Sequence, residues 1–169
     1  PYIFACGFPS LEEEIKGCVA YDNFLGGAID DDVWAGVHCI EALYDAGCRN
    51  ITYSGLTQGY VKSHDDRYKG MYKVLEEHPD MKLLAENYSM GLFADDVATF
   101  NASFNNIEGM GFSAMIDGVY TALESEGMAN GSIKIAAVDI SSMTGNYFKK
   151  GVQVWTCGGQ YATAMVAWA

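Results

Sequence analysis

The chain has 169 residues, half of them hydrophobic, which is enough for one domain with a substantial core. Its 22 acidic and 10 basic residues give a formal net charge of −12, and no cluster of lysines or arginines offers a site for a phosphate backbone, so nucleic acid is not expected to contact it. No apolar stretch approaches the ~20 residues that span a bilayer, and no basic and apolar leader opens the chain.

The chain begins at Pro1 inside an apolar, strand-like run and ends at Ala169 inside a helical pattern, so we expect it to be an excised piece of a longer protein. The absence of a leader then says nothing about export. The cysteines form no CxxC pair, and their odd number argues against a disulfide framework or a structural zinc site. We interpret all five as buried thiols: Cys6, Cys18, Cys39, Cys48 and Cys157.

Strand and helix patterns alternate in the first half of the chain. The run PYIFACG is strand-like, and a helical pattern begins after Gly26 and ends at Gly47, a favourable residue for a helix C-cap. Its apolar residues recur with a 3.6-residue period: Ile29, Val33, Val37, Ile40 and Tyr44. NITYSG then predicts a strand, and a second helical pattern stops before Pro79, with an apolar stripe made of Tyr68, Met71, Tyr72 and Leu75.

The second half repeats this order. MKLLAENY predicts a strand, and the helical pattern after it has Asp95 and Asp96 in its first turn, where the helix dipole favours acids. That helix carries the clearest apolar stripe of the chain: Phe93, Val97, Phe100, Phe104 and Ile107. GMGFSAM predicts a strand and turn, 116–126 a helix, IKIAAVDIS and VQVWTC two further strands, and the last residues a C-terminal helix.

Strands that alternate with helices of this length pair in parallel through right-handed crossovers. The sequence therefore predicts an α/β fold, a doubly wound, mostly parallel sheet with helices on both faces. In such sheets ligands bind at the carboxyl ends of the strands, where loops lead into helices. These loops are glycine-rich and polar here, with aromatic residues between: ACGFPS, YDNFLGG, SGLTQGYVKSHDDR, NYSMG, GFSAMIDG, VDISSMTGNY and TCGGQY.

Several of these segments resemble motifs of one family, in the same order. CVAYDNFLGG resembles the strand that crosses between lobes in the ribose-binding group of type I periplasmic solute-binding proteins, where a D-N-x-x-G-G turn begins a helix. Four further segments resemble family motifs. ALYDAGCRNITYSG resembles the family's helix, glycine and strand, and DDRYKGMYKVL resembles its R-x-x-G helix. IDGVYTALESEG resembles its G-x-x-x-A-L helix, and IKIAAVD resembles its V-x-G-x-D strand. The resemblance covers essentially the whole chain, and lac repressor-like regulators share the same core.

The resemblance implies two α/β lobes joined by three crossing segments, with the solute held in the cleft between them. It divides this chain into a terminal strand and crossing segment of the N-terminal lobe (1–21), the C-terminal lobe (22–142), and a return crossing with an N-terminal-lobe strand and helix (143–169). Apolar residues at both ends would lack the strands and helices that cover them in the family, so we expect the fragment to self-associate. These residues are Ile3, Phe4, Trp155, Met165 and Trp168.

Asp139 is the first candidate ligand-binding residue that the resemblance implies. It ends the strand IKIAAVD and matches the family's sugar-contacting aspartate, where a carboxylate can accept two hydroxyl hydrogen bonds; a structural cap is the alternative. Arg67 matches a helix arginine that the family uses mostly for structure. The ligand-contacting arginine two residues earlier is replaced by Asp65, so His64 and Asp65 are candidates for that contact, with a solvated loop as the alternative.

Other positions depart from the family pattern. An Asp-Arg pair of the N-terminal lobe falls on Cys6 and the glycine after it, and a cleft asparagine falls near Phe112 and Ser113, which argues against the family's pentose specificity. Tyr88, Phe93 and Phe112 are candidates for stacking on a sugar face, with a place in the core as the alternative. Gln160 lies near the family's third-crossing glutamine.

Asp22 and Asn23 form the candidate hinge. Either side chain can cap the following helix, and Gly26 and Gly27 allow close backbone approach. An ordinary N-cap without a hinge function is the alternative.

We therefore expect a non-catalytic solute-binding component of an ABC-type importer, with a small polar ligand, a carbohydrate, in its cleft. It would need neither cofactor nor metal, would have an ABC transporter permease as partner, and would be extracellular or periplasmic, free or lipid-anchored. The alternative is the effector-sensing domain of a lac repressor-like transcription regulator in the cytoplasm.

An enzyme is the third class considered. GMGFSA mimics a dinucleotide motif, but the residues before it predict the end of a helix, not a buried strand. No signature of a thiol catalyst surrounds Cys6 or Cys157.

Overall fold

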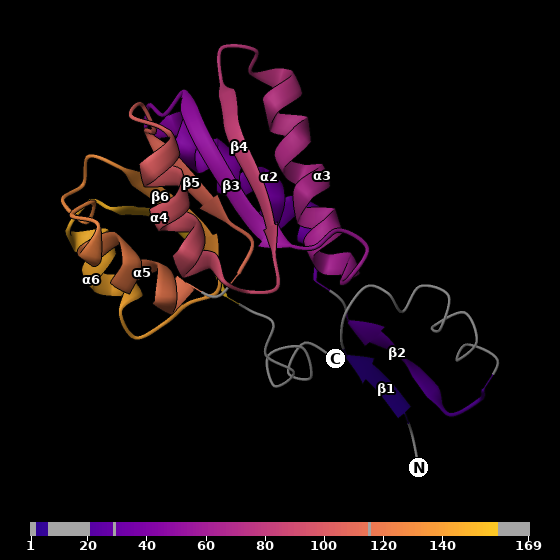
Figure 1. Cartoon of the computed structure of the whole chain (residues 1–169). Coiled ribbons are helices and arrows are strands. Elements are labelled where there is room, and N and C mark those ends of the chain that lie inside the picture. The colour runs from indigo at the N-terminus through magenta and orange to yellow at the C-terminus, as the bar shows by residue number, and fades with distance from the viewer. Residues whose placement is uncertain (1–2, 7–20, 29, 115, 159–169) are drawn as a thin grey trace.

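The computed structural model describes residues 3–6, 21–28, 30–114 and 116–158 (Figure 1). Its elements in chain order are β1 (Ile3–Cys6), β2 (Phe24–Ala28), α2 (Asp32–Asp45), β3 (Asn50–Leu56), α3 (Lys62–Glu77), β4 (Lys82–Ser89), α4 (Phe93–Ser103), β5 (Gly109–Phe112), α5 (Ile116–Ser125), β6 (Lys134–Val138), α6 (Thr144–Lys149) and β7 (Gln153–Cys157). None of the helices in these ranges is long and apolar enough to cross a membrane.

Five strands form one all-parallel sheet in the order β4-β3-β5-β6-β7. Strand β3 lies between β4 and β5, so the chain runs outward in one direction from β3 and then back across it in the other. This arrangement confirms the predicted α/β class, a doubly wound parallel sheet. A separate parallel pair joins β1 to β2, from Ile3 beside Phe24 to Cys6 beside Ala28.

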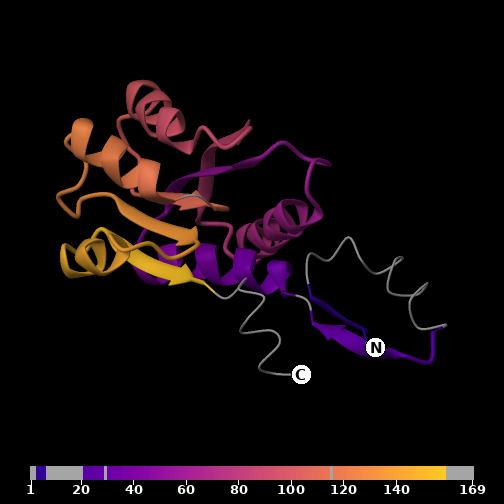
Figure 2. The same cartoon turned by 90° about the horizontal axis from the view of Figure 1, so that it is seen from below.

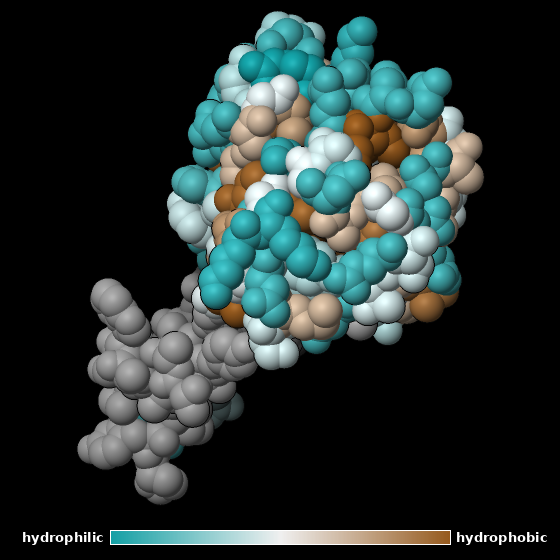
Figure 3. All heavy atoms as spheres, turned by 90° about the vertical axis from the view of Figure 1, so that its left-hand side faces the viewer, coloured by the Kyte–Doolittle hydropathy of each residue, from teal (hydrophilic) through white to brown (hydrophobic). Residues whose placement is uncertain are grey.

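Helices cover both faces of the five-stranded sheet. Seen from below, α2 and α3 lie on one side and α4 and α5 on the other (Figure 2). The ring of Tyr147 in α6 stacks on Tyr120 of α5 with centroids 3.9 Å apart, so α6 belongs with the α4 and α5 side. The outer surface on the side where α5 and α6 lie is mostly hydrophilic, with small apolar patches between (Figure 3).

Each face of the sheet has its own buried cluster. On the α4 and α5 face it is made of aromatic and aliphatic side chains such as Val97, Phe112 and Leu123. On the α2 and α3 face it includes Cys39, Cys48 and two buried tyrosines, Tyr53 and Tyr68. The interpretation of Cys39 and Cys48 as buried thiols is confirmed; Cys157 is partly buried and also free.

Helix α2 ends as the sequence predicts but begins later. Gly47 has a φ of +91° and its N–H donates to the Tyr44 carbonyl at 2.9 Å, a glycine-terminated C-cap. At the other end Asp31 is the N-cap, and its carboxylate accepts the Trp34 N–H at 2.9 Å. The expected cap at Asp22 or Asn23 is therefore wrong.

The glycine pair after Asn23 lies in a strand. Residues 24–28 pair with β1, and pairing with a neighbouring strand overrides the local pattern that suggested a helix start. Asp22 and Asn23 form the turn before that strand, with the Phe24 N–H donating to the Tyr21 carbonyl at 3.0 Å. The hinge function of Asp22 and Asn23 stays a prediction.

The buried sides of two helices also differ from the predicted stripes. In α2 the buried apolar side chains are Ala35, Cys39, Ile40 and Leu43, because the helix packs against both α3 and the sheet; Val33, Val37 and Tyr44 are only partly buried. Helix α4 ends at Ser103, so Phe104 and Ile107 follow it, although Ile107 still packs in the core.

The five-stranded sheet extends beyond residue 142. Strand β7 pairs with β6 from Gln153 beside Ile135 to Cys157 beside Val138, and α6 connects the two strands. The sequence had assigned these elements to the return crossing and the N-terminal lobe. The predicted C-terminal helix lies outside the described residues, as does Cys18.

Candidate functional site

The polar residues predicted as candidates gather at one edge of the sheet, where the parallel strands end. Asp139 directly follows β6 and has a φ of +84°, the only positive φ among the described residues other than glycine. Its N–H donates to the Cys157 carbonyl at 2.8 Å, and its own carbonyl accepts the Thr156 hydroxyl at 2.5 Å. A left-handed backbone at a non-glycine residue is costly, and such residues cluster at functional sites.

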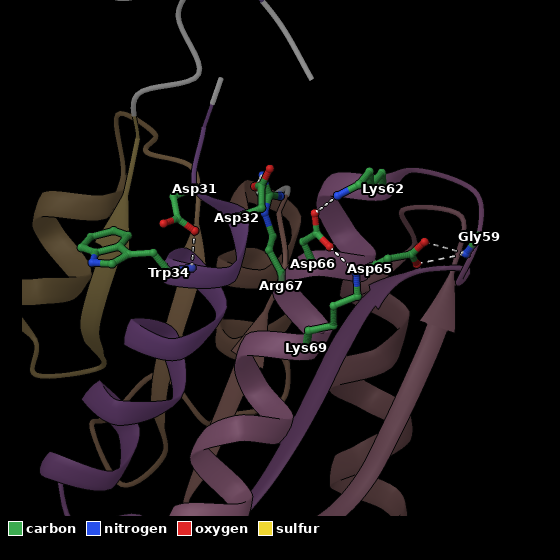
Figure 4. A network of polar contacts seen from close by, with 9 residues as sticks. All are labelled: Asp31, Asp32, Trp34, Gly59, Lys62, Asp65, Asp66, Arg67 and Lys69. Atoms are coloured by element: carbon green, nitrogen blue, oxygen red, sulfur yellow. Dashed lines mark hydrogen bonds and ion pairs between the residues drawn. The ribbon is translucent and has the colours of Figure 1, made fainter. Parts of the chain in front are cut away.

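Beside this edge lies a buried ion pair between α2 and α3. Nε of Arg67 donates to Oδ1 of Asp32 at 2.7 Å, and Nη2 lies 2.6 Å from the same oxygen. Nη1 donates to the Ser113 carbonyl at 2.6 Å, which ties α3 to the loop after β5. Both charged side chains are only 2% exposed, and Figure 4 shows Arg67 extending from α3 toward Asp32. The interpretation of Arg67 as a structural residue is supported by these contacts.

Two glycines explain why Arg67 lies so close to α2. A Cβ on Gly36 of α2 would overlap the Arg67 carbonyl oxygen, and a Cβ on Gly70 of α3 would overlap the Val33 carbonyl oxygen. The backbones of α2 and α3 therefore touch where they cross. Because the two backbones are in contact there, the Arg67 side chain begins close to α2 and reaches Asp32 in the first turn of that helix.

His64 and Ser113 make the second buried contact of the edge. Nδ1 of His64 lies 2.7 Å from the Ser113 hydroxyl, and the two residues are 7% and 0% exposed. Burial, with repulsion from Arg67, lowers the pKa of His64 to about 4, so the ring is neutral at pH 7. The structure brings these two predicted residues together from α3 and the loop after β5.

Asp65 stabilises the loop before its own helix. Its two carboxylate oxygens accept the Gly59 N–H at 3.0 and 3.1 Å (Figure 4). Its neighbour Asp66 pairs with Lys62 and Lys69, and this pairing lowers the pKa of Asp66 against the opposing effect of burial. The contacts with Gly59 join Asp65 to the loop before α3, and its contact with a ligand stays a prediction.

The three aromatic candidates lie in different surroundings. Phe112 is fully buried in the core of the α4 and α5 face, with its ring centroid 6.4 Å from that of Phe93. Tyr88 is 37% exposed at the end of β4, where its hydroxyl accepts the Gln58 amide at 2.7 Å. Burial of Phe93 and Phe112 favours their core alternative, whereas Tyr88 is partly exposed at the edge.

The remaining candidates are not brought to this site by the described contacts. Cys6 ends β1, in the separate two-stranded sheet. Gln160 lies outside the described residues. Both stay predictions.

A cavity of about 220 Å³ lies at the start of α2, below the ends of β6 and β7. Sequence reasoning did not single out most of its lining: Asp30, Asp31, Asp32, Trp34, Ala35, Arg67, Val138, Cys157 and Gly158. Burial raises the pKa of Asp30 and of Asp32, with Arg67 opposing the shift in both, and burial raises the pKa of the Cys157 thiol to about 11. The run of three aspartates before an apolar helical pattern was the available signal, because acids favour a helix start.

In the part of the chain that the structure describes, no group of three or more His, Cys, Asp or Glu residues is arranged to hold a metal ion.

Comparisons with known proteins identify the class of fold. No family model matches the chain, and no curated protein matches its sequence. Among solved structures, the twin-arginine translocation pathway signal protein from Burkholderia phytofirmans is similar with a TM-score of 0.74 and 21% identity, over 92% of this chain and 49% of that one. A carbohydrate transporter solute-binding protein from Agrobacterium radiobacter, in complex with D-arabinose, gives a TM-score of 0.70 and 16% identity, over 86% of this chain and 57% of that one.

A sugar-binding transcriptional regulator of the LacI family from Escherichia coli, complexed with phosphate, is also similar. Its TM-score is 0.66 at 14% identity, over 85% of this chain and 59% of that one. The chain thus spans about half to three fifths of the length of these structures. At these identities the similarity establishes the fold, which is that of a single lobe of type I periplasmic binding proteins and LacI-type regulators.

Proposed function

We propose that this chain is part of a solute-binding protein of an ABC-type sugar importer, which closes two lobes over a carbohydrate. The observation that carries the proposal is the edge of the parallel sheet, where Asp139, His64 and Ser113 lie near the Arg67–Asp32 pair. Crevices outside the carboxyl ends of such strands are where ligands bind in open α/β sheets.

Each residue of the edge has a role in this proposal. Asp139 accepts ligand hydroxyl hydrogen bonds, since its carboxylate follows the carboxyl end of β6 and offers two acceptor oxygens. The His64 ring and the Ser113 hydroxyl are buried in contact with each other and add no charge to the site, which suits a neutral polyol. Tyr88 offers an aromatic face at the rim.

The proposal includes no catalysis. The thiols of Cys39 and Cys157 have pKa values raised to about 12 and about 11 by burial, so neither is a reactive thiolate near neutral pH. The permease of the importer is the proposed protein partner, and the space outside the cytoplasmic membrane is the proposed location.

The similarity to the LacI-family regulator favours a second candidate, a cytoplasmic effector-sensing domain. The same edge would then bind an effector. The coding sequence upstream of Pro1 distinguishes the two: a secretory or lipoprotein signal supports the importer, and a helix-turn-helix supports the regulator.

The test is a thermal-shift screen of the full-length protein against a carbohydrate library and the common amino acids. A ligand at a hundredfold excess over its Kd stabilises the folded state by about 2.7 kcal/mol. We expect hits among the carbohydrates. Hits confined to amino acids would overturn the proposed substrate class.

The variant Asp139→Asn then tests the site itself. Asparagine tolerates a positive φ, as aspartate does, so the unliganded fold should keep its melting temperature. The affinity for the carbohydrate should fall by about 1.5–3 kcal/mol, the range for hydrogen bonds to charged groups. The control Asp45→Asn makes the same change at the far end of α2 and should leave affinity unaltered. Unchanged binding by Asp139→Asn together with a lower melting temperature would show that Asp139 is only a cap.

A further inference from the structure

The cavity at the start of α2 has an unusual balance of charge for a site that takes a neutral sugar. Its lining holds three aspartates, Asp30, Asp31 and Asp32, and one basic residue, Arg67. Three carboxylates against one guanidinium leave two formal negative charges uncompensated within the lining.

Arg67 is not available to a ligand. Nε donates to Oδ1 of Asp32 and Nη1 to the Ser113 carbonyl, whereas Nη2 lies 2.6 Å from the same Oδ1 as an ion pair and has no hydrogen-bond partner among the described residues. The side chain is 2% exposed, so its charge is already compensated and covered by protein. A ligand carboxylate or phosphate would meet the aspartates without gaining a cation, and anionic sugars are therefore disfavoured.

Asp32 keeps one acceptor without a donor. Because both contacts from Arg67 converge on Oδ1, the other oxygen, Oδ2, is buried and has no hydrogen-bond partner among the residues that the structure describes. The Asp32 side chain is 98% buried, since only 2% is exposed, and it lines the cavity. A buried carboxylate oxygen without a donor is costly, and a ligand N–H or O–H would remove that cost.

The other aspartates add charge and not donors. Asp30 is partly buried in the same lining, and burial raises the pKa of both Asp30 and Asp32, with Arg67 opposing the shift. Asp31 uses one oxygen to cap α2 through the Trp34 N–H. The Trp34 ring, 47% exposed, forms an aromatic wall of the cavity and stacks on His38 with centroids 4.1 Å apart.

We propose that this cavity binds a protonated amine carried by a polyhydroxyl ligand, in its simplest form an amino sugar, and this deepens and rests on the proposed function. The ammonium group supplies donors to Asp32 Oδ2 and a positive charge to Asp30, and Trp34 takes a cation or a sugar face equally well. The cavity volume of about 220 Å³ is below the roughly 300–1,000 Å³ of sites for drug-sized ligands, which fits one small group or ring.

The test measures the affinity of the full-length protein for matched sets of sugars by calorimetry. Each set holds a neutral sugar, its amino sugar and the N-acetylated form, in the glucose, galactose and mannose series and in the series of any carbohydrate that binds in the library screen. The amino sugar of at least one series should bind about tenfold tighter than both neutral forms, as for one hydrogen bond to a charged group.

Two variants separate the cavity from the general negative charge of the protein. Asp30→Asn leaves the Arg67–Asp32 pair intact and should lower affinity for the amino sugar by about tenfold with little change for the neutral parent. Asp45→Asn, the same change at the exposed far end of α2, should alter neither.

The outcomes distinguish this inference from the proposed function. Equal or tighter binding of the neutral forms in every series that binds, or an unchanged amino-sugar preference in Asp30→Asn, would overturn the amine site and leave a sugar-binding protein. Failure of every carbohydrate to bind would overturn both.

Discussion

The two faces of the five-stranded sheet are built on different principles. The α4 and α5 face is held by apolar packing, in which Val97, Phe112 and Leu123 are fully buried. The α2 and α3 face buries a charged pair, Arg67 and Asp32, beside a neutral histidine, and its two helices touch through glycine. Both faces bury polar side chains, Asp96 of α4 among them, but the buried Arg67–Asp32 ion pair belongs to the α2 and α3 face, at the edge where the candidate site lies.

The difference separates stability from function. An apolar face stabilises in rough proportion to the area it buries and tolerates many arrangements. A buried ion pair contributes little net stability, but any other packing that leaves one of its charges buried without a partner is strongly destabilised. The α2 and α3 face accordingly fixes the start of α2, and with it the aspartates and Trp34 that line the cavity.

The largest effect should come from Arg67→Met. It removes the one counter-ion that the described residues provide to the buried Asp32, and the donor to the Ser113 carbonyl, so the free energy of unfolding should fall by about 3–5 kcal/mol at pH 7. Urea denaturation of the full-length protein measures this. The double variant Arg67→Met/Asp32→Asn removes the orphaned charge and should recover a good part of the loss. A loss below about 1 kcal/mol in the single variant would mean that the pair does not hold the face together.

Acid should weaken the same face through His64. The pKa of His64 is about 4 in the folded protein and near 6.5 when unfolded, so between these values the unfolded state binds more protons. The contribution of His64 is fully present above pH 6.5 and is lost as the pH falls toward 4, with a total on the order of 2–3 kcal/mol.

The variant His64→Asn isolates that contribution from the acids that titrate in the same range. The asparagine amide can still reach the Ser113 hydroxyl, so its stability at pH 7 should stay close to that of the parent. Between pH 7 and pH 4, the free energy of unfolding of His64→Asn should fall by about 2–3 kcal/mol less than that of the parent protein. Parallel pH profiles for the two proteins would contradict a buried neutral histidine.

The smallest effect compares one glycine from each face. Gly70→Ala places a Cβ against the α2 backbone, which must move, and should cost about 1–3 kcal/mol. Gly118→Ala in α5 meets only the Ala94 Cβ at 3.5 Å and should stabilise the protein by roughly 0.5–1 kcal/mol, because alanine is the better helix former. Opposite signs in thermal denaturation are expected. Two changes of the same sign would mean that the faces do not differ in how closely their helices approach.

Most of the fold was predictable because its signals are local. Apolar periodicity and glycines located six strands and the cores of four helices, and their alternation implied a parallel sheet. The short helix α6 and the strand β2 were not predicted. Helix α6 has six residues and no clear stripe, and β2 exists only because β1 lies beside it.

The candidate site was predictable in part. The position of Asp139 at a strand end follows from its place after an apolar run, and the approach of His64 to Ser113 was not visible, since 49 residues separate them. The cap role of Asp31 was hidden by the earlier DNFLGG segment, which has the stronger local turn signal.

The sequence by itself determined which residues form the parallel strands, because short apolar runs between glycine-rich loops are buried when they form interior strands of a parallel sheet. It also determined that polar loops follow those strands. Only the tertiary structure decided which loop residues face one another. The crossing of α2 and α3 at Gly36 and Gly70 lets Arg67 reach Asp32, and a contact between residues 35 positions apart leaves no periodic signal in either segment.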